Sequence, residues 1–89
     1  MQIAICDDER EIRNMLGEKL KRIYPDSGVS FYESGDELLL SDSQPDILLL
    51  DIRMEGKNGM ETAKELRRKN KKMIVIFITA LEEYVFQAF

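Results

Sequence analysis

Three aspartates in this 89-residue chain follow stretches of apolar residues. Asp7 and Asp8 come directly after the run over residues 3–6, and Asp51 follows the run over residues 47–50. Carboxylates that lie close together either raise one another's pKa or bind a cation. The chain has one cysteine and no histidine, so a Cys/His metal site cannot be assembled. Oxygen ligands favour a hard ion, and we expect Mg²⁺, with Mn²⁺ or Ca²⁺ able to substitute.

The residues after the first apolar run argue against a nucleotide or flavin site. A phosphate-binding loop at this place would contain Gly, Ser or Thr, so that backbone N–H groups could surround the phosphate. This chain has Asp-Asp-Glu-Arg-Glu instead, which repels a bare phosphate and suits a metal ion. Each residue alone also has a simpler explanation. Asp8 with Glu11 can form a capping box at the start of a helix, and Asp51 can be an ordinary loop residue.

The hydrophobic pattern alternates between the period of a strand and that of a helix. Runs of apolar or β-branched residues predict strands over residues 3–6, 29–32, 46–52 and 73–79. Helical spacing and capping motifs predict the helices between them: Ile12, Leu16, Leu20 and Ile23 before Pro25; residues 38–40 after a cap at Ser34; Met60, Ala63 and Leu66 after a cap at Asn58; and a helix start over residues 81–89.

This alternation predicts a single α/β domain of the flavodoxin-like type, with three layers and a parallel sheet. Continuous apolar strands belong at the centre, whereas residues 29–32 have a polar face and suit an edge. The expected strand order is therefore 2-1-3-4. In such a sheet, ligands bind beyond the carboxyl ends of the strands, at the switch point between strands 1 and 3. The predicted order gathers Asp7, Asp8 and Asp51 there, with the hydroxyl of Thr79 at the end of strand 4.

Charge and hydropathy narrow the partners that we expect. The net charge of −4 argues against direct binding of nucleic acid. Residues 57–72 carry seven Lys/Arg against two Glu, and we interpret them as a solvated helix end, with a nucleic-acid contact as the alternative. The chain shows no secretory signal and no apolar run near the ~20 residues of a membrane helix, so we expect a cytoplasmic protein. Cys6 is expected to be a small buried strand residue without a redox role.

Three segments resemble response-regulator receiver domains: the A-I-C-D-D-E start, the L-L-L-D-I-R-M-E-G-K-N-G stretch and the I-F-I-T-A segment. The C-D-D-E opening and the T-A-L-E-E-Y-V-F-Q-A-F ending are most similar to receivers that precede a LytTR-type DNA-binding domain. The resemblance covers residues 1–89 and implies a non-enzymatic switch in two-component signalling. Its partner would be a sensor histidine kinase. DNA would be bound only through an effector domain beyond this segment.

The same resemblance implies roles for individual residues of the carboxylate group. Asp51 would be the phosphoacceptor, with a carboxylate oxygen that attacks the phosphohistidine of the kinase. Asp51 and Asp8 would ligate Mg²⁺ directly, and Asp7 would do so mainly through water. Arg53 would give its backbone carbonyl to the metal.

Further residues would act as switch and loop elements in such a receiver. Thr79 would be the hydroxyl that moves to bond a phosphoryl oxygen, and Ala80 would leave room beside the phosphate. Gly56 and Gly59 would shape the loop after the third strand. Glu55 stands where the family usually has Pro, four residues after the phosphoacceptor, and we expect a quantitative effect at most.

The resemblance also implies a domain longer than residues 1–89. A fifth strand, a fifth helix and the Lys that pairs with the phosphate would lie beyond Phe89, so we expect this segment alone to hold a phosphoryl group weakly or not at all. The strand over residues 73–79 would be an open apolar edge, and a dimer could form there or through the helix after it.

Two other functions stay open on the sequence alone. One is a receiver-like interaction module that is not phosphorylated. The other is a Mg²⁺-dependent phosphohydrolase of the haloacid-dehalogenase type, which would need Asp at position 53, where this chain has Arg.

Overall fold

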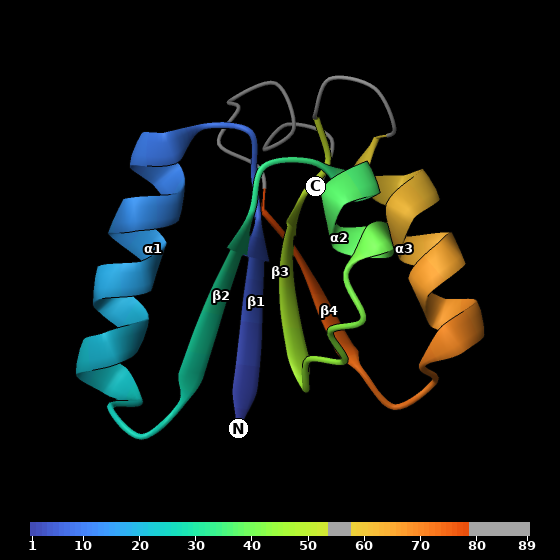
Figure 1. Cartoon of the computed structure of the whole chain (residues 1–89). Coiled ribbons are helices and arrows are strands. Elements are labelled where there is room, and N and C mark those ends of the chain that lie inside the picture. Colours follow the sequence, from blue (N-terminus) through green and yellow to red (C-terminus); the bar gives the residue numbers. More distant parts are fainter. Residues whose placement is uncertain (54–57, 79–89) are drawn as a thin grey trace, which may run out of the picture.

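The computed structural model describes residues 1–53 and 58–78. In these residues strands and helices alternate strictly: β1 (Gln2–Cys6), α1 (Arg10–Ile23), β2 (Gly28–Tyr32), α2 (Gly35–Leu40), β3 (Ile47–Asp51), α3 (Gly59–Lys69) and β4 (Ile74–Ile78). The strands form one parallel sheet in the order β2-β1-β3-β4, which confirms the predicted flavodoxin-like order. Helix α1 lies on one face of the sheet, and α2 and α3 lie on the other (Figure 1). The predicted helix start over residues 81–89 lies outside the described residues.

Two helices begin with the predicted caps. The Ser34 hydroxyl accepts a hydrogen bond from the Glu37 N–H at 3.0 Å at the start of α2. The Asn58 side chain accepts from the Glu61 N–H at 2.9 Å at the start of α3. Helix α1 begins differently, because its N-cap is Glu9 and no side-chain cap bond is present there. The alternative interpretation of Asp8 as a helix cap is therefore wrong.

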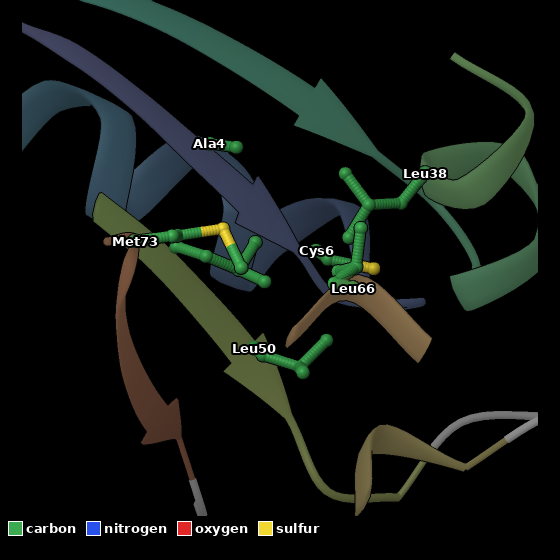
Figure 2. Packing of buried hydrophobic residues seen from close by; sticks show 7 residues of the cluster. Ala4, Cys6, Leu38, Leu50, Leu66 and Met73 are labelled. Carbon is green, nitrogen blue, oxygen red and sulfur yellow. The ribbon is translucent and has the colours of Figure 1, made fainter. Parts of the chain in front are cut away.

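The sheet face beneath α2 and α3 carries the main hydrophobic core. Alternate residues of a strand point to the same face, so β1 and β3 each contribute two side chains to this core. The buried members are Ala4, Cys6, Leu38, Leu48, Leu50, Leu66 and Met73 (Figure 2). Full burial of one leucine side chain stabilises the fold by about 1.5–3 kcal/mol. This packing fixes the ends of β1 and β3 relative to each other.

The apolar stripe predicted for α1 is present only in part. Three of its four positions are half-buried, whereas Ile23 is 63% exposed. The buried residues of the helix are Arg13 and Gly17. A Cβ atom on Gly17 would come within 2.6 Å of the ring of Phe31, so glycine at this position leaves room for that ring against the helix. Arg13, four residues before Gly17, reaches the carbonyl of Asp7 at the carboxyl edge of the sheet.

The stripe predicted for α3 needs one correction, because Met60 is 48% exposed. Its buried face is formed instead by Gly59, Thr62 and Leu66. Thr62 can be buried without an unpaired hydroxyl, since its Oγ1 donates to the carbonyl of Asn58 at 3.0 Å. The helix is therefore rotated so that its first residue faces the sheet.

Strand β4 is an edge of the sheet among the described residues, where β3 is its hydrogen-bonded neighbour. Ile74, Ile76 and Phe77 of this strand are 38–56% exposed, as expected for an apolar edge. A dimer through this edge stays a prediction. Within residues 1–53 and 58–78, no helix has the length and apolar character needed to cross a membrane.

Candidate metal centre

The predicted carboxylates do meet at the carboxyl edge of the sheet. Because β1 pairs with β3 and Cys6 lies opposite Leu50, Asp7, which follows β1, is a neighbour of Asp51, the last residue of β3. Asp7, Asp8 and Asp51 each place a carboxylate oxygen within 4.8 Å of the others. Asp7 is buried, Asp51 is partly buried and Asp8 is exposed. Three oxygen donors at this spacing, open to solvent on one side, fit a hard divalent cation such as Mg²⁺.

Hydrogen bonds hold two of these carboxylates in place. Oδ1 of Asp7 accepts from the N–H of Glu9 at 2.8 Å. Oδ1 of Asp51 accepts from the N–H of Arg53 at 3.1 Å. Both bonds span two residues, so each carboxylate is oriented by the loop that follows its own strand.

Electrostatics at this edge disfavour ionised carboxylates. Burial raises the pKa of Asp51 from 3.8 to about 6, and the negative charges of Asp7, Asp8 and Glu9 add to the effect, against the hydrogen bond from Arg53. Burial also raises the pKa of Asp7. A divalent cation would relieve this repulsion, which is the physical reason for such a group to bind one.

The raised pKa of Asp51 predicts a pH dependence of stability without metal. Its contribution is fully present below the unfolded pKa near 3.8 and is lost as pH rises through about 6. We expect Asp51→Asn to be more stable than the wild type at neutral pH by about 1 kcal/mol, because solvent screens a partly buried carboxyl. The gap should close towards pH 4. Urea unfolding followed by circular dichroism across this range measures it, and a gap that is constant with pH would contradict the assignment.

Cys6 lies directly beside this site, and its thiol is expected to be unreactive. Burial and the charges of Asp7, Glu37 and Asp51 raise the pKa of its thiol to about 12. The thiol therefore stays protonated at neutral pH and packs as a core residue.

Gly59 contacts the backbone of the candidate phosphoacceptor. Its N–H donates to the carbonyl of Ile52 at 2.9 Å. A Cβ atom on Gly59 would come within 2.8 Å of Cα of Ile52, and nearer still to the carbonyl oxygen of Asp51. The start of α3 can approach β3 this closely only with glycine at this position.

The remaining predicted site residues divide into two groups. Arg53 is described and exposed, and the use of its carbonyl as a metal ligand stays a prediction. Thr79, Ala80 and Gly56 lie outside the described residues, as does Glu55.

One residue near the site was not predicted from the sequence. Arg13 of α1 is 8% exposed, and its Nη1 donates to the backbone carbonyl of Asp7 at 2.7 Å. The sequence feature that could have indicated burial of Arg13 was its position three residues before Leu16, which places it on the face of the helix that packs on the sheet.

Taken together, the sheet order and the three carboxylates define a flavodoxin-like α/β domain with an acidic site at its switch point. The family model of the response regulator receiver domain matches residues 3–89, and the chain belongs to this family.

The chain is also similar in sequence to known signalling proteins, which supports its assignment to the receiver family. The chain is 31% identical to the sensory transduction protein LytT of Bacillus subtilis and 39% identical to LytT of Oceanobacillus iheyensis. Each match covers 100% of this chain and 38% of the relative, so the chain spans well under half the length of these proteins.

A solved structure gives the same fold with a ligand bound. The response regulator TrrA of Thermotoga maritima, in complex with Mg²⁺-BeF, matches with a TM-score of 0.83 and 35% identity, over 93% of this chain and 72% of that one. A complex of TrrA with the histidine kinase ThkA matches with a TM-score of 0.77 and 36% identity, over 89% of this chain and 68% of that one.

Proposed function

We propose that this protein is a phosphorylation-controlled switch of two-component signalling, in which Asp51 accepts a phosphoryl group from the phosphohistidine of a sensor histidine kinase. The observation that carries this proposal is the meeting of Asp7, Asp8 and Asp51 at the switch point of a receiver sheet. TrrA, which is similar in fold, supports it through its complexes with Mg²⁺-BeF and with a histidine kinase.

The chain's own residues would carry the transfer. A carboxylate oxygen of Asp51 attacks phosphorus, the P–O bond forms, and the P–N bond to the kinase imidazole breaks. With a pKa of about 6, Asp51 is mostly ionised at neutral pH and can act as the nucleophile. The N–H of Arg53 orients its carboxylate for in-line attack. Mg²⁺, held by Asp8, Asp51 and Asp7, would neutralise the charge of the incoming phosphoryl oxygens.

The proposal extends to the output of the switch. A phosphoryl group on Asp51 adds charge at the carboxyl edge of the sheet and would bias a two-state equilibrium, with Thr79 as the responding hydroxyl. The likeness to two sensory transduction proteins named LytT supports a role in signalling. The resemblance of the C-D-D-E opening to receivers that precede a LytTR-type DNA-binding domain favours a regulator of transcription, whose DNA-binding part would lie outside residues 1–89.

Acetyl phosphate provides a direct test that needs no kinase. We expect the full-length protein, rather than residues 1–89 alone, to incorporate radiolabel from acetyl phosphate in the presence of MgCl₂ or MnCl₂ and to lose that incorporation with a chelator. Beryllium fluoride, which occupies TrrA together with Mg²⁺, is the second probe, read by NMR of isotope-labelled protein. A protein that binds Mg²⁺ but takes up neither probe would be an unphosphorylated interaction module instead. Steady turnover of a phosphorylated metabolite, without labelled protein, would favour a phosphohydrolase.

A further inference from the structure

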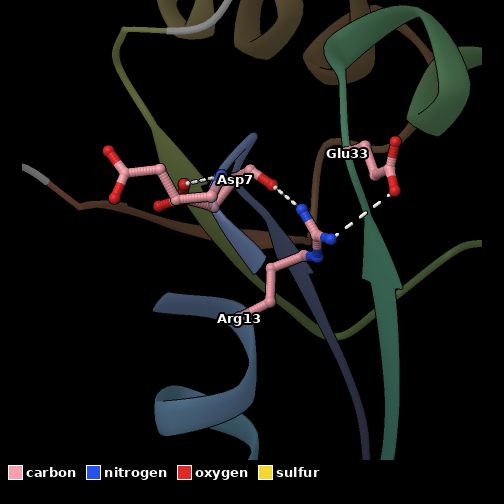
Figure 3. Close-up of polar contacts among 4 residues, drawn as sticks. Asp7, Arg13 and Glu33 are labelled. Atoms are coloured by element: carbon pink, nitrogen blue, oxygen red, sulfur yellow. Dashed lines mark hydrogen bonds and ion pairs between the residues drawn. The ribbon is translucent and has the colours of Figure 1, made fainter. Parts of the chain in front are cut away.

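Arg13 is a buried cation directly beneath the acidic site. Its side chain is 9% exposed and lies between the end of β1 and the residue that follows β2 (Figure 3). Nη1 donates to the carbonyl oxygen of Asp7 at 2.7 Å, and Nη2 is 3.5 Å from a carboxylate oxygen of Glu33. The guanidinium thus joins α1, the end of β1 and the loop after β2 through two nitrogens of one rigid group.

Three hydrogen bonds hold the polar groups of Asp7 in place. Its N–H donates to the carbonyl of Tyr32 at 3.1 Å, and its Oδ1 accepts from the N–H of Glu9 at 2.8 Å. Its carbonyl accepts from Arg13. The peptide that contains this carbonyl leads directly to Asp8, so the bond from Arg13 fixes the direction in which the chain enters Asp8.

We propose that Arg13 is a positioning residue of the metal centre, which sets the place of the Asp8 carboxylate by holding the Asp7–Asp8 peptide. Arg13 touches neither metal nor phosphoryl group in this role. The inference rests on the proposed function, because it concerns the Mg²⁺ site of the same switch. Groups that orient metal ligands in this indirect way commonly change metal affinity by 10- to 100-fold when they are removed.

Two possible roles of Arg13, a nearby positive charge and a group that positions Asp8, predict opposite changes in Mg²⁺ affinity when Arg13 is removed. If Arg13 acted only as a nearby positive charge, it would repel Mg²⁺, and its removal would tighten binding. If it positions Asp8, its removal weakens binding. Arg13→Lys separates the two further, since it keeps the charge but cannot bridge two acceptors with a planar fork.

Arg67 provides a matched control at the opposite edge of the sheet. Its Nη1 also donates to backbone carbonyls, to Met73 at 2.6 Å and to Lys71 at 3.1 Å. Both arginines therefore fasten a loop, but only Arg13 fastens the loop that carries carboxylates. Arg67→Met should lower stability without affecting the metal centre.

The experiment is a titration of isotope-labelled protein with MgCl₂, followed by two-dimensional NMR, together with urea unfolding of each variant. We expect Arg13→Met to raise the half-saturating Mg²⁺ concentration about tenfold and Arg13→Lys about threefold, with less than a twofold change in Arg67→Met. If the NMR spectrum shows that Arg13→Met is unfolded, the Mg²⁺ affinity of Arg13→Lys is the test. Unchanged or tighter Mg²⁺ binding in the folded Arg13 variants overturns the inference. Absence of saturable binding in the wild type would overturn the proposed metal site itself.

Discussion

In the full-length protein, Asp51→Asn should abolish uptake of the phosphoryl group from acetyl phosphate, while the domain stays folded. Asparagine keeps an oxygen that can accept the hydrogen bond of the Arg53 N–H, so the loop after β3 retains its anchor. It lacks the ionised oxygen that would attack phosphorus. We expect radiolabel incorporation to fall to the level of a sample without protein, which is a loss of more than about 100-fold.

Asp46→Asn is the matched control, because it makes the same change at the other end of the same strand. Asp46 precedes β3, and its Oδ2 accepts from the N–H of Gln2 at 2.7 Å, far from the carboxyl edge of the sheet. This variant should incorporate radiolabel as the wild type does. Labelling that persists in Asp51→Asn would move the acceptor to another residue, with Asp7 and Asp8 as the first to examine by peptide mapping.

The placement of these carboxylates could be predicted because it depends on topology alone. Continuous apolar strands such as 46–52 must lie inside a sheet, and alternation with helices makes that sheet parallel. All strand ends then meet at one edge, and a central pairing of β1 with β3 brings Asp51 beside Asp7 and Asp8. No knowledge of side-chain packing is needed for this step.

Contacts that depend on packing could not be predicted in the same way. Arg13 is one of many charged residues in α1, and its burial and its bond to the carbonyl of Asp7 depend on how the helix packs on the sheet. Met60 was predicted to be inside because it is apolar, yet α3 turns Gly59 and Thr62 inward. Hydrophobic periodicity does not account for small residues such as Gly59 that allow a helix to pack closely on the sheet.

The alternative interpretation of Asp8 as the cap of α1 failed for a related reason. Asp8 and Glu11 have the spacing of a capping box, which is a local signal. In the structure, the N–H of Glu9 donates to the side chain of Asp7, and α1 starts at Arg10 without a side-chain cap. A loop that must present carboxylates at the sheet edge leaves Asp8 outside the helix, and this gives up a local stabilisation of about 1 kcal/mol.

Gly59→Ala should destabilise the domain and weaken its phosphorylation together. The added Cβ would meet Cα of Ile52 at 2.8 Å and would press on the carbonyl of Asp51, and backbone atoms cannot rotate away as a side chain can. Either α3 must move outward or the end of β3 must shift with its carboxylate. We expect a loss of about 3 kcal/mol, the upper end of the range for overpacking, which is a large share of the stability of so small a domain.

Gly28→Ala is the control for this prediction. A Cβ atom at the start of β2 would meet the amide end of Gln2, whose exposed side chain can turn away, so we expect a loss below about 1 kcal/mol and unchanged labelling. Urea unfolding gives the stabilities, and incorporation of radiolabel from acetyl phosphate gives the effect on the site. Equal losses in the two variants would mean that the contact of Gly59 with the Asp51 backbone has no special weight. A Gly59→Ala protein that is destabilised but labels normally would show that α3, and not the acceptor strand, yields to the added methyl group.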